Sequence, residues 1–214
     1  MKMCRFFILL VLLVFNTVTA SASDRLLPVD EASLNPDFFA FRVQLQSAIA
    51  RRDPNFLLNV ISKDIFFSFG SESGFDDFVK NWDPSRPDSP VWPIMAETLA
   101  LGGTFDSDGS FTAPYVFTNW PNDKDAFEFV AVIAADVPVY SQPSNAAPVI
   151  DHLSFSVVEL ANDQFSQASW THIKLDQNRT GFMESSFLRS SLADRLRFSK
   201  IDGRWQISVF ISGD

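Results

Sequence analysis

Cysteine and histidine are nearly absent from this sequence, which has one cysteine and two histidines among its 214 residues. A disulfide needs two cysteines, and structural zinc sites are built mainly from cysteine and histidine. The fold must therefore be held together by apolar packing, and the composition fits, with 46% hydrophobic residues and 23 phenylalanines. We expect no disulfide, no metal and no cofactor.

Basic residues are also scarce, because 17 Lys and Arg stand against 26 Asp and Glu and give a formal net charge of −9. Nucleic acids and anionic lipid surfaces attract basic proteins and repel acidic ones. We therefore expect no nucleic acid and no charged membrane surface as a partner. The simplest interpretation of the acidity is solubility.

The longest apolar run lies at the N-terminus and has the three parts of a secretory signal peptide. Lys2 and Arg5 form a basic region, residues 6–15 are uniformly apolar, and residues 20–22 (ASA) form a small-residue processing site. A run of this length is far shorter than the ~20 residues of a membrane-spanning helix. We predict that residues 1–22 are a cleaved leader, that the protein is exported to the periplasm or beyond, and that no stable membrane insertion remains.

Helix signals dominate the first half of the mature chain. Residues 23–34 are polar without a clear period, so we interpret them as a tether. Asn35 and Asp53 each precede a proline, which places an N-cap before a first-turn proline, and apolar residues at helical spacing follow both. We predict a helix after each cap and two more over residues 75–82 and 91–101.

Strand signals in the same half are shorter. Residues 65–69 are rich in aromatic and β-branched side chains, and their apolarity predicts a strand that is buried on both faces. Residues 104–117 contain the turn sequence Asp106-Ser107-Asp108-Gly109, which predicts a hairpin.

The C-terminal residues carry the clearest local signal. Asp202-Gly203 is typical of a type I′ turn between strands at residues 195–201 and 204–211. This register gives three facing pairs: Leu196 with Val209, Phe198 with Ile207, and Lys200 with Trp205. One side of the hairpin is then apolar and must be buried. We predict that it joins the sheet of the earlier strands; the alternative is two strictly sequential domains.

Between these regions the sequence changes to many short strands. They are predicted at residues 129–134, 137–140, 149–160, 169–175 and 180–183. Strands at this density favour a small all-β barrel. The predicted fold class is therefore α+β. A helical part with a small antiparallel sheet covers residues 34–127 and is completed by the hairpin of residues 190–214, and a barrel covers residues 128–189.

Four motifs in this stretch resemble, in order and spacing, the landmarks of bacterial Src-homology-3 domains. They are residues 137–144 (VPVYSQPS), 149–154 (VIDHLS), 170–173 (WTHI) and 179–183 (RTGFM). The family usually has Tyr-Val where this chain has Phe182-Met183, which keeps a ring and loses a hydroxyl. The resemblance implies a non-enzymatic module that recognises peptide, such as a cell-wall peptide or an envelope protein.

Aromatic residues of the predicted barrel are the candidate binding residues. Src-homology-3-type grooves hold extended peptides against aromatic walls, because rigid rings offer apolar area with little loss of entropy. We assign binding to Tyr140, Trp170 and Phe182; the alternative is that each completes the barrel core.

The flanking regions look loosely like a nuclear-transport-factor-two-like cone, a fold that can enclose an apolar pocket. This likeness implies an alternative function, a small-ligand binder or an unrecognised enzyme that uses a pocket in the α+β part. A closed cavity with converging polar groups would favour it, and a solid core of phenylalanines would not.

No catalytic constellation is recognisable, so we expect no enzyme activity. Residues 70–74 (GSESG) have Glu at the centre, where a nucleophile elbow needs Ser. Neither His152 nor His172 has a second His or Cys at ligand spacing. His172 alternates with Trp170 and Lys174, so we interpret it as a surface or half-buried strand residue.

Overall fold

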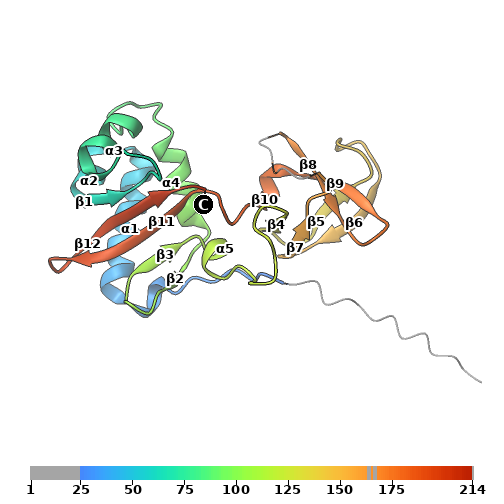
Figure 1. Ribbon diagram of the computed structural model, residues 1–214, viewed down its shortest axis with the longest axis horizontal. Helices are drawn as coiled ribbons and strands as arrows, with labels where there is room; N and C mark the ends of the chain where they lie inside the picture. Colours follow the sequence, from blue (N-terminus) through green and yellow to red (C-terminus); the bar gives the residue numbers. More distant parts are fainter. Residues whose placement is uncertain (1–24, 163–164, 166–167, 214) are drawn as a thin grey trace, which may run out of the picture.

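The computed structural model describes residues 25–162, 165 and 168–213, so the predicted leader of residues 1–22 lies outside the described part. The chain is mixed α/β, with five α-helices and three small sheets among the described residues. Its elements form two units that lie side by side (Figure 1). We call residues 32–128 and 190–213 the α+β unit, and residues 129–189 the β unit.

The helices of the α+β unit are α1 (Pro36–Arg51), α2 (Pro54–Val60), α3 (Gly74–Trp82), α4 (Val91–Ala100), α5 (Tyr115–Thr118) and a 3-10 turn η1 (Ala32–Leu34). The four predicted helices are confirmed. Asn35 and Asp53 cap α1 and α2, because each side chain accepts a hydrogen bond of 3.1 Å from the backbone N–H three residues on.

The five strands of this unit are β1 (Ile61–Phe66), β2 (Thr104–Phe105), β3 (Phe111–Ala113), β11 (Arg195–Ile201) and β12 (Arg204–Ile211), in the order β1-β12-β11-β3-β2. The C-terminal hairpin therefore lies in the middle of the sheet. The pair β1–β12 is parallel, and the prediction of an antiparallel sheet is wrong at this edge. A parallel pair needs a long crossover, and here residues 67–203 lie between the two strands.

The strand β1 also differs from its prediction, because it begins at Ile61 and ends at Phe66. Ile65 is fully buried, whereas Phe66 is 43% exposed and Phe69, beyond the strand, is 57% exposed. The prediction of burial on both faces is wrong, because β1 is an edge strand and α3 packs beside it on one side.

The type I′ turn of the hairpin is confirmed, since Asp202 and Gly203 have φ of 49° and 75°. Two predicted pairs are present, Phe198 with Ile207 and Lys200 with Trp205. Leu196 faces Phe210 instead of Val209, because a β-bulge adds one residue to β12 beside Arg197. A bulge of this kind depends on neighbouring strands, so the turn alone could not predict it.

The β unit contains two open sheets. One has the order β10-β4-β7, from β4 (Phe129–Val132), β7 (Val157–Glu159) and β10 (Leu188–Arg189). The other has the order β6-β5-β9-β8, from β5 (Val137–Tyr140), β6 (Val149–Leu153), β8 (Trp170–Lys174) and β9 (Thr180–Glu184), with a 3-10 turn η2 (Ser185–Phe187) after β9. No sheet of the described residues closes into the predicted barrel; β7 and β8 come together through the isolated bridge of Leu160 with Ile173.

Two backbone corners explain why the sheets stay separate. The predicted strand at residues 149–160 is broken at Phe155, whose φ is 48°, and the chain leaves one sheet for the other there. Asp136, with φ of 54°, forms the matching corner between β4 and β5. The corners bond to each other, since Asp136 N donates to Ser154 Oγ at 2.8 Å and Phe155 N donates to Ala134 O at 3.1 Å.

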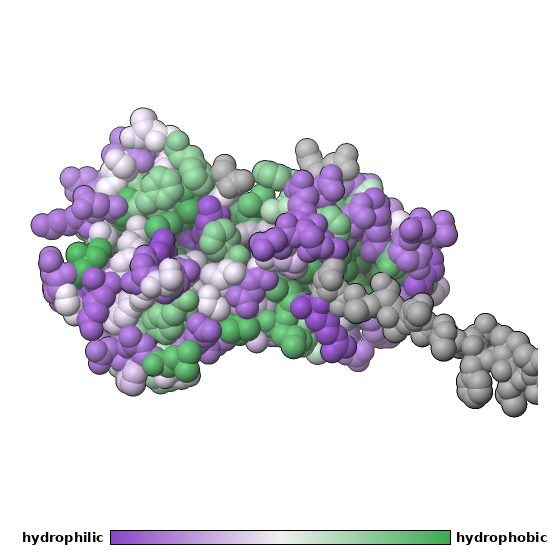
Figure 2. Space-filling view, turned by 60° about the horizontal axis from the view of Figure 1, so that its bottom comes forward, coloured by the Kyte–Doolittle hydropathy of each residue, from purple (hydrophilic) through white to green (hydrophobic). Residues whose placement is uncertain are grey.

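Residues 25–31, which we call the strap, hold the two units together. Leu26 N donates to Phe155 O in the β unit at 2.8 Å, and Gly103 N of the α+β unit donates to Val29 O at 3.0 Å. Asp30 receives two hydrogen bonds of 2.7 Å from the buried Arg42. On the face of the molecule that Figure 2 shows, hydrophobic surface lies where the two units meet. The predicted tether is wrong over residues 25–34, because backbone pairing and an ion pair order a segment without a hydrophobic period.

Candidate functional site: an aromatic face on the four-stranded sheet

The three predicted binding residues lie on one face of the sheet β6-β5-β9-β8. On each strand a residue next to them is buried: Val139 and Met183 belong to the core of the β unit, and Thr171 is a buried polar residue. Because side chains alternate along a strand, Tyr140, Trp170 and Phe182 point away from that core. All three are half-buried. The core itself is aliphatic, formed by Val130, Val132, Val137, Val139, Val158, Leu160, Ile173, Met183 and Leu188.

The rings form a continuous row across β5, β9 and β8. Tyr140 and Trp170 meet edge to face, with ring centroids 5.4 Å apart and planes at 90°. Tyr140 also faces Phe182 in the β5–β9 pairing. Phe182 in turn stacks on His172, with centroids 4.4 Å apart and planes at 6°. We call these four residues the aromatic face.

His172 was not among the predicted binding residues. Its alternation with Trp170 and Lys174 placed it on a strand surface, and the structure places it there, half-buried. Its membership of the row depends on the pairing of β8 with β9, which sets His172 opposite Phe182. Alternation along one strand gives the side on which a residue lies, and only the register between strands gives its neighbours.

The charged residues around the aromatic face are mostly paired with one another. Lys174 donates to Glu159, and Arg179 bonds Asp176 at 2.6 Å and Asp151 at 3.3 Å. The backbone N–H of Asn178 and the Arg179 guanidinium lower the pKa of Asp176. Both cations are therefore engaged within the β unit.

Glu184 differs from these residues. It is the β-ladder partner of Trp170, so the two side chains lie on the same face of the sheet. Among the residues that the structure describes, its carboxylate has neither a hydrogen bond nor an ion pair. The aromatic face thus ends at a half-buried residue, Glu184, whose carboxylate has no partner among the described residues.

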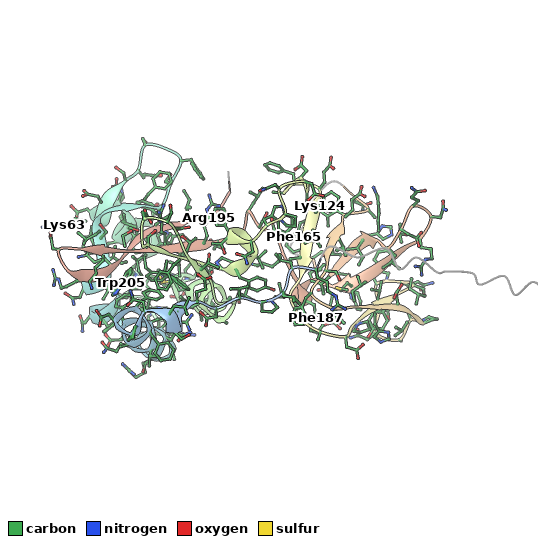
Figure 3. All side chains as sticks on the ribbon, turned by 90° about the horizontal axis from the view of Figure 1, so that it is seen from below. Lys63, Lys124, Phe165, Phe187, Arg195 and Trp205 are labelled. Carbon is green, nitrogen blue, oxygen red and sulfur yellow. The ribbon has the colours of Figure 1, made fainter. Side chains whose placement is uncertain are left out.

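The α+β unit has a packed aromatic core where the alternative function needs a pocket. The ring of Phe38 is fully buried. Its centroid lies 4.4 to 5.6 Å from those of Phe105, Phe111, Phe198 and Trp205. Trp205 belongs to β12, and its ring contacts Phe38 of α1 (Figure 3). The hollow beside it, of about 340 Å³, is open and has charged Lys200 and Arg204 in its lining. These residues do not support an enclosed apolar pocket.

Residues 25–162, 165 and 168–213 contain neither a metal-binding cluster nor a helix that could span a membrane. No group of three or more His, Cys, Asp or Glu in this part could hold a metal ion. None of the helices in the same part has the length and apolarity needed to cross a membrane.

Comparison with protein-family models finds no match, and comparisons with curated proteins and with solved structures find no significant similarity. The resemblance of residues 137–183 to bacterial Src-homology-3 domains therefore stays a prediction from the motifs.

Proposed function

We propose that this chain is an exported, non-enzymatic binding protein whose β unit is a Src-homology-3-like module that holds an extended peptide against the aromatic face. The observation that carries the proposal is the row of Tyr140, Trp170, Phe182 and His172 on the outside of the four-stranded sheet. Rings that only filled a core would point inward with Val139, Ile173 and Met183.

The shape of the row supports an extended ligand. It continues onto the edge strand β6, where Val149 faces Tyr140 and is 46% exposed. A peptide that crosses the strands from β6 to β8 would contact apolar groups along its whole path. Aromatic side chains have few rotatable bonds, so holding a peptide against them orders little of the protein.

The proposed ligand is a peptide of the bacterial cell wall. The predicted leader would take the chain to the compartment where that peptide lies. An acidic protein is not drawn to nucleic acid, which fits the same assignment. An extended peptide segment of an envelope protein is the other source of the same chemistry.

Retention on purified peptidoglycan tests the proposal. The chain from residue 23 is incubated with sedimented peptidoglycan, and the bound fraction is compared with that of Trp170→Ala. We expect the wild type to be retained and Trp170→Ala to lose about tenfold in affinity, as is typical of a central aromatic contact. The control is Phe127→Ala, which removes a ring that is 64% exposed and lies outside the aromatic face.

Failure of the folded wild type to sediment with peptidoglycan would reject the cell-wall ligand. Equal retention of the wild type and Trp170→Ala would reject the aromatic face as the binding surface. Circular dichroism of each variant establishes that the fold is retained.

A further inference from the structure

The end of the aromatic face near Glu184 combines three groups that attract a cation. Glu184 lies opposite Trp170 in the β8–β9 ladder, and directly opposite side chains are only about 5 Å apart at Cβ. The ring of Tyr140 stands at 90° to that of Trp170, with centroids 5.4 Å apart. The two rings and the carboxylate therefore form a corner.

The chemistry of this corner selects the charge of its ligand. The faces of aromatic rings carry partial negative charge and attract ammonium and guanidinium groups. A carboxylate accepts strong hydrogen bonds from an N–H that carries positive charge. An anionic group in the same place would meet repulsion from all three.

The neighbouring cations of the β unit are committed elsewhere. Lys174 donates to Glu159, and Arg179 is held by Asp176 and Asp151. Among the residues that the structure describes, no cation pairs with Glu184, so its carboxylate can accept an ammonium group from a ligand.

We propose that the aromatic face binds a peptide through a primary ammonium group, which Glu184 accepts and which the rings of Trp170 and Tyr140 enclose. The occupant is a cell-wall peptide with a free amino group on a diamino acid. This inference rests on the proposed function, because it names the group by which the same face recognises its peptide.

Acetylation of the free amines of purified peptidoglycan tests the inference. Acetylation removes the positive charge and leaves the rest of the wall peptide in place. We expect the chain from residue 23 to bind untreated peptidoglycan about tenfold more tightly than the acetylated form. Glu184→Gln should show the same loss of about tenfold on untreated material, and acetylation should cost it little more, because ammonium and carboxylate act as one pair.

The matched control is Glu72→Gln, which removes the same charge from an exposed position in the α+β unit. It should bind both materials as the wild type does. If Glu72→Gln lost as much affinity as Glu184→Gln, net charge would explain the effect and the inference would be overturned.

Two further outcomes separate this inference from the proposed function. Equal binding of acetylated and untreated peptidoglycan by the wild type overturns the ammonium site and leaves peptide binding intact. If the chain is not retained on peptidoglycan at all, the cell wall is not its ligand. The ammonium site is then tested by titrating the chain with Nα-acetyl-lysine amide and following the NMR signal of the Trp170 indole N–H. A shift that disappears in Glu184→Gln supports an ammonium site with another peptide source, and the absence of any shift overturns it.

Discussion

One unit of this molecule has an aromatic core, whereas the other has an aliphatic core and carries aromatic rings on the outer face of a sheet. In the α+β unit the rings of Phe38, Phe78, Phe111, Phe198 and Phe210 are fully buried and belong to one hydrophobic cluster. In the β unit the buried core cluster is aliphatic, and four aromatic rings line the outer face of one sheet. Phe165 and Phe187 only flank that core (Figure 3).

The difference shows that aromatic content by itself does not indicate a binding site. A ring that contacts other rings between a helix and a sheet stabilises the fold, as Phe38 of α1 does. A ring on a sheet face whose opposite side is already filled by Val and Ile is available to a ligand, as Trp170 is. Strand alternation and the composition of the core together separate the two cases.

The largest expected effect comes from Phe38→Ala in the α+β unit. The substitution removes a ring at the centre of the buried cluster, and such truncations destabilise by about 3–5 kcal/mol. Urea denaturation followed by circular dichroism gives the free energy of unfolding. Phe182→Ala in the β unit is the comparison, and it should cost about 1 kcal/mol or less because the ring is half-buried. Similar losses for the two variants would contradict the division between an aromatic core and an aromatic face.

Gly181→Ala should have the next largest effect, in the β unit. A Cβ at this position would lie 2.5 Å from Val139 Cγ1 and 3.1 Å from Tyr140 O, so the Val139 side chain must shift and the β5 backbone must give slightly at Tyr140. Overpacking of this kind costs about 1–3 kcal/mol. Displacement of β5 should also disturb Tyr140 and weaken retention on peptidoglycan. Thr180→Ala, at the exposed neighbouring position, is the control and should change neither quantity; unchanged stability of Gly181→Ala would show that the two strands are not closely packed.

Local signals in the sequence predicted the parts of the fold that depend on a few adjacent residues. The caps at Asn35 and Asp53 and the turn at Asp202-Gly203 form because their hydrogen bonds and dihedral angles are set within one short segment. Alternation likewise placed the side chains of β8 on their correct faces. These features need no knowledge of the rest of the chain.

Features set by distant contacts were not predictable in this way. Phe155 adopts a positive φ that phenylalanine rarely takes, and only the corner it shares with Asp136 explains it. The strap has no hydrophobic period, because its order comes from backbone bonds to both units. The stacking of His172 on Phe182 and the place of Glu184 beside Trp170 both follow from the register of β8 with β9.

Asp30→Asn tests how the strap is attached to the α+β unit. The side chain of Arg42 is only 9% exposed, and its bidentate pair with Asp30 supplies its charged partner. Loss of that charge should destabilise the protein by about 1–2 kcal/mol. The effect is smaller than for a fully buried pair, because the Asp30 side chain is 46% exposed and solvent screens its charge. Asp88→Asn is the control, since Arg86 also binds Asp88 through two hydrogen bonds, but on the surface. Urea denaturation of Asp88→Asn should match the wild type, and an equal loss in both variants would mean that burial of the pair is unimportant.

The smallest expected effect is a loss of stability at acidic pH, and it should have the same direction in the two units. The hydroxyl and backbone N–H of Ser110, together with Arg197, lower the pKa of Asp108 from 3.8 to about 2. A carboxyl whose pKa is lowered by folding stabilises the native state above its unfolded pKa, and this stabilisation disappears as the pH falls through the folded pKa. The difference in urea midpoint between the wild type and Asp108→Asn should therefore be constant above about pH 5 and shrink from about pH 4 to about pH 2. Asp176→Asn in the β unit should follow the same direction, because folding also lowers the pKa of Asp176. A difference that grows in acid for either variant would contradict this assignment and show that these exposed turns, like the two cores, are stabilised differently in the two units.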